Sequence, residues 1–279
     1  MKKIVALDIG GTNTRVALIN EKYELETVLI KDTVVGNRDA FLNSVAAIIE
    51  EAIPNFENVA AIACGVPGRV RYDGYIAALP NVGISDIPLA QFLSARFNVP
   101  AFVKNDAEVA ALAEANVGPN ASYPSLYFVT VSTGVGGALT IGGRLVNSSY
   151  EVGHTATFYK GQLYEFEHLC SGTGLKKLCA VNGLEVPNSK AFFDLVIAKD
   201  ETALRIYHDW IELFASWLKM NQEALDPAVF AFTGGVFKAK DIFFEDLRKA
   251  APFAHLEECG CGQYAGLIGS AVFGFQMTA

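Results

Sequence analysis

The chain has 279 residues, of which 51% are hydrophobic and 19% charged, so it has the composition of a globular protein and not of a disordered one. Its formal net charge is −8 and it has no run of Lys and Arg, which argues against nucleic-acid binding. No apolar stretch reaches the roughly 20 residues of a membrane span, and the five scattered cysteines are no disulfide framework. The apolar run before Asp8 is too short for a signal peptide, so we expect a cytoplasmic protein without a nucleic-acid or membrane partner.

The first half of the chain alternates predicted strands and helices. Two short apolar runs around a glycine pair, residues 4–9 and 14–19, predict a β-hairpin. Apolar spacing and turn residues predict the elements that follow. These are helices over 39–53, 89–97 and 107–115, and strands over 59–64 and 100–103.

The pattern begins again after residue 122. A strand over 125–131 and a return strand over 138–141 enclose a second glycine-rich turn, about 125 residues after the first. A long amphipathic helix over 202–225, a strand over 227–232 and a small-residue helix from 264 complete the chain. Because strands and helices alternate in both halves, we predict an α/β protein with two similar lobes.

Three glycine turns are candidates for binding phosphate or nucleotide. Glycine pairs let the backbone turn tightly and bring N–H groups close to an anion, and each turn follows an apolar strand. Asp8, at the end of the first strand, suits a water-mediated Mg²⁺ contact. Taken alone, the first and second turns are more simply explained as ordinary hairpins, and the third turn is a weak signal. The candidates are Asp8, Gly10, Gly11 and Thr12 in the first turn, Thr133 and Gly134 in the second, and Gly234 and Gly235 in the third.

Polar residues after another strand are candidates for acid–base chemistry. Asp106 follows a predicted strand and could accept a proton from a substrate hydroxyl, a role worth typically 10²–10⁴-fold. Asn105 and Asp106 are equally good candidates for a helix N-cap. Further along, Glu151, His154 and Glu167 could bind sugar hydroxyls, whereas His168, His208 and His255 have no such context and are taken as structural.

Six segments in this order and spacing resemble the ROK-family sugar kinases. They are DIGGTNTR, KNDAEVAALAEA, TVSTGVGG, EVGH, SGTGL and TGGVF, and the resemblance extends from residue 4 to about 275. It implies a two-lobed actin/hexokinase-like ATPase fold of RNase H-like repeats, with an active-site cleft between the lobes. We place the N-terminal lobe at 1–106 and the C-terminal lobe at 107–264, with a helix over about 265–279 packing back on the first lobe.

The resemblance also implies roles for individual residues. Asp106 would be the catalytic base, and the two glycine hairpins and the third turn would hold the phosphates and adenosine of ATP·Mg²⁺. The residues on the sugar side would be Gly65, Asn81, Asn105, Glu151, His154 and Glu167. The family further implies a homodimer.

One segment departs from the family pattern. The usual ROK protein has a CxCGxxGCxE zinc motif just after the Glu-Val-Gly-His segment, but residues 155–167 contain no cysteine here. A structural zinc site needs about four nitrogen or sulfur ligands, which His154 alone cannot supply. We therefore predict no structural zinc. Cys259 and Cys261 are either a redox pair or a chance pair, and we favour the chance pair.

The substrate is the open part of this interpretation. The segment FEHLCSGTGL is similar to that of zinc-free bacterial glucokinases, which implies glucose and its 6-hydroxyl as phosphoryl acceptor. N-acetylmannosamine and N-acetylglucosamine are the alternatives within the family. From other classes, the rivals are a sugar-sensing regulator and a catalytically silent sugar-binding protein. The first hairpin begins at residue 4, which leaves no room before it for the regulator's helix-turn-helix.

Overall fold

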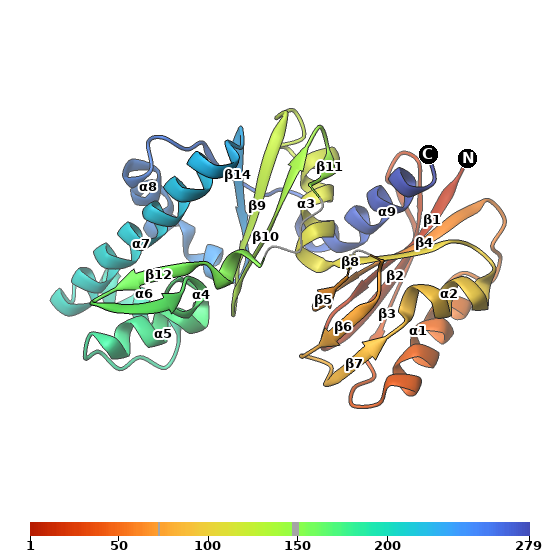
Figure 1. The fold of residues 1–279 in the computed structure, drawn as a ribbon, viewed down its shortest axis with the longest axis horizontal. Helices are drawn as coiled ribbons and strands as arrows, with labels where there is room; N and C mark the ends of the chain where they lie inside the picture. Colours follow the sequence, from red (N-terminus) through yellow and green to blue (C-terminus); the bar gives the residue numbers. More distant parts are fainter. Residues whose placement is uncertain (72, 147–150) are drawn as a thin grey trace. The chain divides into compact units, whose positions relative to one another are not determined.

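The computed structural model describes residues 1–71, 73–146 and 151–279. The chain divides into two compact units, and each is discontinuous in sequence (Figure 1). Unit 1 comprises Met1–Ser122, Thr140–Ser149 and Gly260–Ala279, and unit 2 comprises Tyr123–Leu139 and Tyr150–Cys259. Unit 1 thus contains the C-terminal helix and the helix that begins at Asp106, which pack against each other. The lobe boundaries expected from the sequence stay a prediction.

The main sheet of unit 1 begins with the predicted glycine hairpin. Its strand order is β3-β2-β1-β4-β8, with β1 antiparallel to β2 and parallel to β4, and β4 parallel to β8. The carboxyl ends of β1, β4 and β8 therefore meet at one edge of the sheet. The strands are β1 (Lys3–Ile9), β2 (Asn13–Asn20), β3 (Leu25–Asp32), β4 (Val59–Val66) and β8 (Ala101–Asn105).

A second five-stranded sheet, of which β9, β14 and β15 belong to unit 2 and β11 to unit 1, repeats this arrangement. Its order is β11-β10-β9-β14-β15. Two strands joined by a glycine-rich turn, β9 and β10, thus again lie beside two parallel strands, β14 and β15. The predicted α/β fold with two similar halves is confirmed by this repeat. The strands are β9 (Ser125–Val131), β10 (Val135–Ile141), β11 (Arg144–Leu145), β14 (Val229–Thr233) and β15 (Leu256–Glu258).

Helices cover both faces of the unit 1 sheet. Apolar side chains of α1 and α2 join the larger core cluster with β1 and β4, while α9 covers the opposite side with Leu267 and Ala271 (Figure 1). Helix α9 packs against α3, β1 and β4, and Ser270 Oγ donates to the carbonyl of Leu7 over 2.9 Å. The helices are α1 (Arg38–Ala52), α2 (Leu89–Phe97), α3 (Asp106–Asn116) and α9 (Ala265–Met277).

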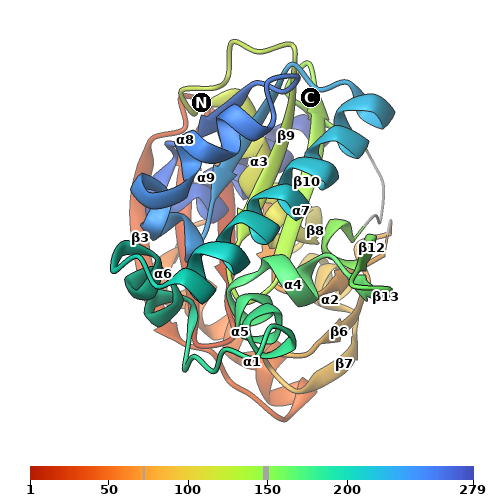
Figure 2. The ribbon, with the colours of Figure 1, turned by 90° about the vertical axis from the view of Figure 1, so that its left-hand side faces the viewer.

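Helix α7 (Glu201–Leu225), labelled in Figure 2, is the long amphipathic helix predicted for this half of the chain. It contributes eight buried side chains to the core of unit 2, among them both tryptophans. Asp200 caps it by accepting from the Ala203 N–H, and buried residues recur every three or four positions. Among them, Trp217 and Phe214 contact rings of β9 and β14. Burying one such ring contributes roughly 1.5–3 kcal/mol. The other helices of unit 2 are α4 (Glu167–Cys170), α5 (Gly172–Val181), α6 (Ser189–Ile197) and α8 (Lys240–Ala250).

Several short elements were not predicted from the sequence. Unit 1 has a small antiparallel sheet of β5 (Arg69–Val70), β6 (Ile76–Leu79) and β7 (Ile84–Ile87). Unit 2 has the hairpin of β12 (Ala156–Tyr159) and β13 (Gln162–Glu165). Three 3₁₀ turns are η1 (Val152–His154), η2 (Val236–Ala239) and η3 (Gly262–Tyr264). Among the described residues, no helix has both the length and the apolar composition that crossing a bilayer requires.

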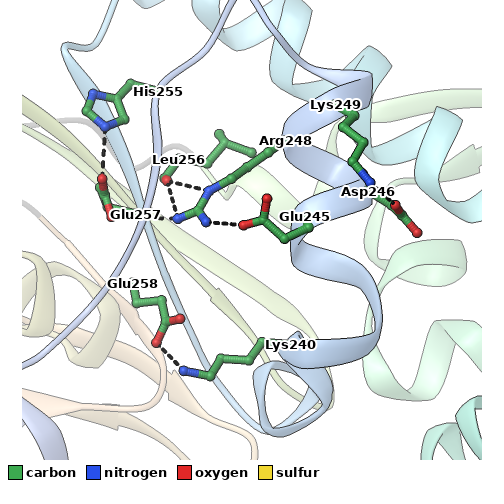
Figure 3. A network of polar contacts seen from close by, with 9 residues as sticks. All are labelled: Lys240, Glu245, Asp246, Arg248, Lys249, His255, Leu256, Glu257 and Glu258. Carbon is green, nitrogen blue, oxygen red and sulfur yellow. Dashed lines mark hydrogen bonds and ion pairs between the residues drawn. The ribbon is translucent and has the colours of Figure 1, made fainter.

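Arg248 of α8 holds the edge strand of unit 2 (Figure 3). Its Nε and Nη2 donate to the carbonyl oxygen of Leu256 in β15 over 3.2 and 3.0 Å, and its guanidinium lies 4.4 Å from the centre of the Phe244 ring. We expect Arg248→Ala to lower the free energy of unfolding by about 1–2 kcal/mol, because a carbonyl loses both charged donors. Urea titration followed by circular dichroism measures this.

Lys249→Ala is the matched control for that experiment. Lys249 contacts Asp246 over 3.0 Å, but its side chain is 74% exposed, and exposed ion pairs contribute only about 0–1 kcal/mol. A loss for Lys249→Ala as large as that for Arg248→Ala would contradict the role assigned to the Leu256 contact.

Candidate functional site

Strand register brings the unit 1 candidates to one edge of the sheet. Asp8 of β1 pairs with Gly65 of β4, and Gly65 pairs with Lys104 of β8. The residues that follow this row leave the sheet together at the carboxyl ends of the three parallel strands. Ligands of α/β proteins bind at such ends. We name this group of residues the unit-1 edge; it comprises Asp8, Gly10–Thr12, Gly65–Gly68, Asn81, Asn105 and Asp106.

The first glycine turn contacts Asn81 directly. A Cβ built on Gly11 would lie 2.9 Å from the Cβ of Asn81, so only glycine fits beside that residue. The Gly10 N–H donates to the carbonyl of Asn13 over 2.8 Å, and the carbonyl of Thr12 accepts from the Thr33 N–H. Thr12 and Asn81 are both exposed, so a predicted phosphate-loop residue and a predicted sugar-side residue lie close together in unit 1.

Asp8 lies between an arginine and the first turn of α9. Its Oδ2 is 3.3 Å from Arg15 Nη1, and a Cβ on Gly266 would lie 2.6 Å from its Cγ. Burial raises the pKa of Asp8, while Arg15 opposes that rise. Arg15 also donates to the carbonyl of Gln263 over 3.0 Å. The carboxylate is thus partly buried and oriented, which suits an oxygen ligand for a hydrated cation.

Asn105 caps α3, as one of the two interpretations predicted. Its Oδ1 accepts from the Ala107 N–H over 2.8 Å, its Nδ2 donates to the carbonyl of Gly68 over 3.1 Å, and Glu108 completes a capping box. Asp106 is the first residue of the helix, and its exposed carboxylate accepts from Ala107 over 2.9 Å. Asn105 is therefore the cap of α3, and Asp106, the candidate base, is the residue next to it.

Gly65 has a structural explanation of its own. A Cβ there would lie 2.6 Å from Cγ2 of Val109, so the glycine lets β4 approach α3 closely. This contact accounts for the residue type without any ligand. The contribution of Gly65 to sugar binding stays a prediction.

The predicted nucleotide turns of unit 2 meet at Ser132. The Ser132 carbonyl accepts from the Gly172 N–H over 2.7 Å, and its Oγ accepts from the Gly235 N–H over 3.1 Å. Gly234 has a φ of +112°, and a Cβ there would lie 2.3 Å from the carbonyl oxygen of Val131, so this turn requires glycine. Ser132 and Gly172 were not predicted as site residues, although Ser132 directly precedes the second glycine turn and Gly172 lies in the SGTGL segment.

Glu167 lies between two glycine backbones. Its Oε2 accepts from the Val135 N–H over 3.1 Å, and Cβ atoms built on Gly134 and Gly153 would lie 2.6 and 2.7 Å from the same oxygen. The carboxylate of a predicted sugar-binding residue therefore fits directly against the second glycine turn, at Gly134. Glu151, at the start of η1, is exposed.

His154 has a partner that the sequence did not suggest. Its Nδ1 is 2.7 Å from Oε2 of Glu165, and Nε2 of His168 lies 3.4 Å from the same oxygen. Ligand atoms of His154, Glu165 and Glu167 lie within 4.8 Å of one another. The pKa of His154 is raised, mainly because the carboxylate of Glu165 accepts a hydrogen bond from its ring. The sequence signal for this contact was a turn at Lys160 and Gly161, which was not predicted. Both residues have positive φ, and the hairpin that they close pairs Ala156 with Glu165, close to His154.

Cys261 shows no sign of thiolate reactivity. All five cysteines lie in described segments and are free thiols. Burial and the carboxylate of Glu114 raise the pKa of Cys261 to about 12. Glu114 itself is fully buried, and it accepts from the N–H groups of Gly260 and Cys261 and from Asn120. A thiol that stays protonated is a poor nucleophile. The choice between a chance pair and a redox pair stays a prediction.

Comparison with known proteins identifies the family. A model of the ROK family matches residues 4–271. The chain belongs to the ROK family. A ROK hexokinase structure from Thermus thermophilus superposes with a TM-score of 0.85 at 27% identity, covering 99% of this chain and 98% of that one, so the fold expected from the resemblance is confirmed.

Two of the relatives are named as kinases of different sugars. The N-acetyl-D-glucosamine kinase of Histophilus somni is 30% identical over 267 residues, which cover 88% of this chain and 87% of the relative. The glucokinase of Thermotoga maritima is 24% identical over 274 residues, which cover 88% and 86%.

Proposed function

We propose that this ROK protein is an ATP-dependent kinase that phosphorylates the 6-hydroxyl of a hexose or N-acetylhexosamine, with N-acetylglucosamine as its preferred acceptor. The observation that carries the proposal is the family match over residues 4–271, together with an exposed carboxylate, Asp106, at the unit-1 edge. Four N-acetyl-D-glucosamine kinases are 27–30% identical, against 24–25% for two glucokinases. This order favours the alternative acceptor over the glucose that the sequence suggested first.

Asp106 is the base of the proposed reaction. As the sugar oxygen bonds to the γ-phosphorus of ATP, its proton passes to the Asp106 carboxylate, and the bond from γ-phosphorus to the bridging oxygen breaks to release ADP. The N–H of Ala107 holds one carboxylate oxygen of Asp106 over 2.9 Å. An aspartate on the first turn of a capped helix has little freedom, which favours a fixed position for proton transfer.

Backbone N–H groups and Mg²⁺ balance the phosphate charge in this proposal. Phosphoryl transfer depends mainly on positioning and charge stabilisation. The Gly10–Thr12 turn and the Thr133–Gly134 turn are the candidates for phosphate contacts, and Gly234 and Gly235 for the adenosine side. Asp8 fits a Mg²⁺ that arrives with ATP, because its partly buried carboxylate offers oxygen ligands beside the first turn.

The sugar contacts of the proposal come from carboxylates, amides and one imidazole. Glu151, His154 and Glu167 are the candidates in unit 2, and Asn81 and Asn105 are those in unit 1. Carboxylates accept two hydroxyl hydrogen bonds at once, which suits the adjacent hydroxyls of a pyranose. The homodimer, the cytoplasmic location and the absence of structural zinc stay predictions.

A sugar panel tests the function. At saturating ATP and Mg²⁺, we expect N-acetylglucosamine to give the highest kcat/KM. Glucose should be at least about tenfold lower, because a site that binds an acetamido group leaves polar groups unpaired with a sugar that lacks it. N-acetylmannosamine should be lower as well, because its acetamido group has the opposite configuration at the 2-position. A coupled assay for ADP release and mass measurement of the sugar phosphate detect the product. Glucose as the best acceptor would overturn the preference, and no phosphorylated sugar at all would overturn the kinase.

A further inference from the structure

Glu165 connects two histidines at the end of the β12–β13 hairpin. It pairs in register with Ala156, and its Oε2 lies 2.7 Å from His154 Nδ1 and 3.4 Å from His168 Nε2. The three side chains are 42–55% exposed, and exposed pairs of this kind contribute little to stability. The contact therefore needs an explanation other than stability.

The contact decides which nitrogen of His154 is available. Imidazole has two distinct ring nitrogens, and the partner of one fixes the tautomer and the orientation of the ring. With Nδ1–H donated to Glu165, Nε2 is the atom left to meet a ligand. Glu167, whose ligand oxygen lies within 4.8 Å of those of His154 and Glu165, is fixed separately by the Val135 N–H.

Charges around the ring strengthen this pairing. Glu165 of β13, Glu167 of α4 and Glu151 at the start of η1 all raise the pKa of His154, and Glu165 does so most through its hydrogen bond. The same hydrogen bond lowers the pKa of Glu165, to which His168 and Lys177 contribute as well. Each group therefore shifts the pKa of the other in the direction that favours the contact.

We propose that Glu165 is a positioning residue for sugar recognition: its carboxylate binds His154 Nδ1 and so presents Nε2 of that ring to a sugar hydroxyl. The inference rests on the proposed function for the hydroxyl, and on the 2.7 Å contact for the geometry. Glu165 does not touch the reacting atoms, so its loss affects sugar affinity and leaves the phosphoryl-transfer step intact.

Kinetics of Glu165→Ala and Glu165→Gln test the proposal. We expect the KM for the sugar to rise about tenfold in Glu165→Ala, the low end of the effect of lost orienting partners, and less in Glu165→Gln, whose amide oxygen still accepts. The kcat and the KM for ATP stay within about twofold of wild type. Glu257→Ala is the matched control, because Glu257 of β15 pairs with Nε2 of His255 over 2.9 Å (Figure 3). We expect kcat and both KM values of Glu257→Ala to stay at those of the wild type.

A double-mutant cycle shows whether Glu165 acts through His154. In a His154→Ala background, Glu165→Ala has no further effect on the KM for the sugar, because its partner is gone. An equal effect in both backgrounds, an unchanged KM, or a fall in kcat alone would overturn the proposal. So would one equivalent of bound metal in the wild type that Glu165→Ala loses, because the cluster would then bind a cation.

NMR titration tests the contact without any substrate. The His154 pKa, raised above 6.5 in the wild type, returns toward that value in Glu165→Gln and not in Glu257→Gln. An unchanged His154 pKa would refute the pairing. If the wild type phosphorylates no sugar and the His154 pKa still responds, the proposed function fails and the pairing stands, so the two failures are distinguishable.

Discussion

Replacing Asp106 by asparagine is expected to lower kcat by about 10²–10⁴-fold while the protein still binds its sugar. In the wild type the Ala107 N–H donates to the Asp106 carboxylate over 2.9 Å. Asparagine has nearly the same shape and keeps an oxygen that can accept this hydrogen bond. It cannot take up the hydroxyl proton as the new bond to phosphorus forms. The loss therefore falls on turnover, and steady-state kinetics with binding calorimetry separates it from sugar affinity.

The fold of Asp106→Asn should be unaffected. Asn105, not Asp106, supplies the cap of α3, and Asp106 is exposed. Asp39 provides a matched control, because it too is an exposed acid in the first turn of a helix whose cap, Asn37, lies before it. Asp39→Asn should keep wild-type turnover. If Asp106→Asn turned over sugar at a near wild-type rate, Asp106 could not be the base.

The two glycine hairpins were predictable because each combines two strong local signals. Apolar strands stand on both sides of a glycine pair or triplet, and the observed strands β1, β2 and β9 agree with the predicted ranges within one residue. Strand β10 begins at Val135, three residues before its predicted range, so the second turn is shorter than predicted. Helix α2 begins and ends at the predicted residues, and α7 differs by one, since its apolar spacing is long and regular. The position of Asp8 beside Gly65 was not predicted, because it depends on the parallel register of β1 and β4 that the structure shows.

The partner of His154 was not predictable in the same way. The β12–β13 hairpin is short and exposes Phe158 and Leu163 by 70% and 67%, so it lacks the alternation of a half-buried strand pair. Without that hairpin, Glu165 has no reason to lie beside a histidine eleven residues earlier. The contacts of Ser132 were equally hidden, because they join three turns that lie far apart in the sequence.

The small residues of helix α9 were recognised in the sequence, but the close packing that requires them was not predicted. A Cβ on Gly269 would lie 1.6 Å from the carbonyl oxygen of Val109 in α3, and one on Gly274 would lie 2.9 Å from Ile4. The small side chains therefore let two helices and a sheet approach closely, and this packing makes the end of the chain part of unit 1.

Gly269→Ala is consequently expected to cost about 3 kcal/mol of unfolding free energy, the upper part of the range for overpacked cores. The atom that the new methyl would meet belongs to the backbone of α3, so no rotamer change relieves the contact. For a protein of this size the melting temperature should fall by about 6–12 °C. Circular dichroism is the suitable measurement, because both tryptophans, Trp210 and Trp217, lie in unit 2.

Gly235→Ala separates this contact from the general effect of replacing a glycine. Gly235 has a φ of −64°, and a Cβ there would meet only Ser132 Oγ at 4.0 Å, so alanine fits and the melting temperature should stay level or rise slightly. Moving α3 away from α9 would also move Asp106, which lies one helical turn before Val109. The folded Gly269→Ala variant should therefore lose turnover as well as stability. A melting temperature equal to that of the wild type would contradict the close approach of α9 to α3 at Val109.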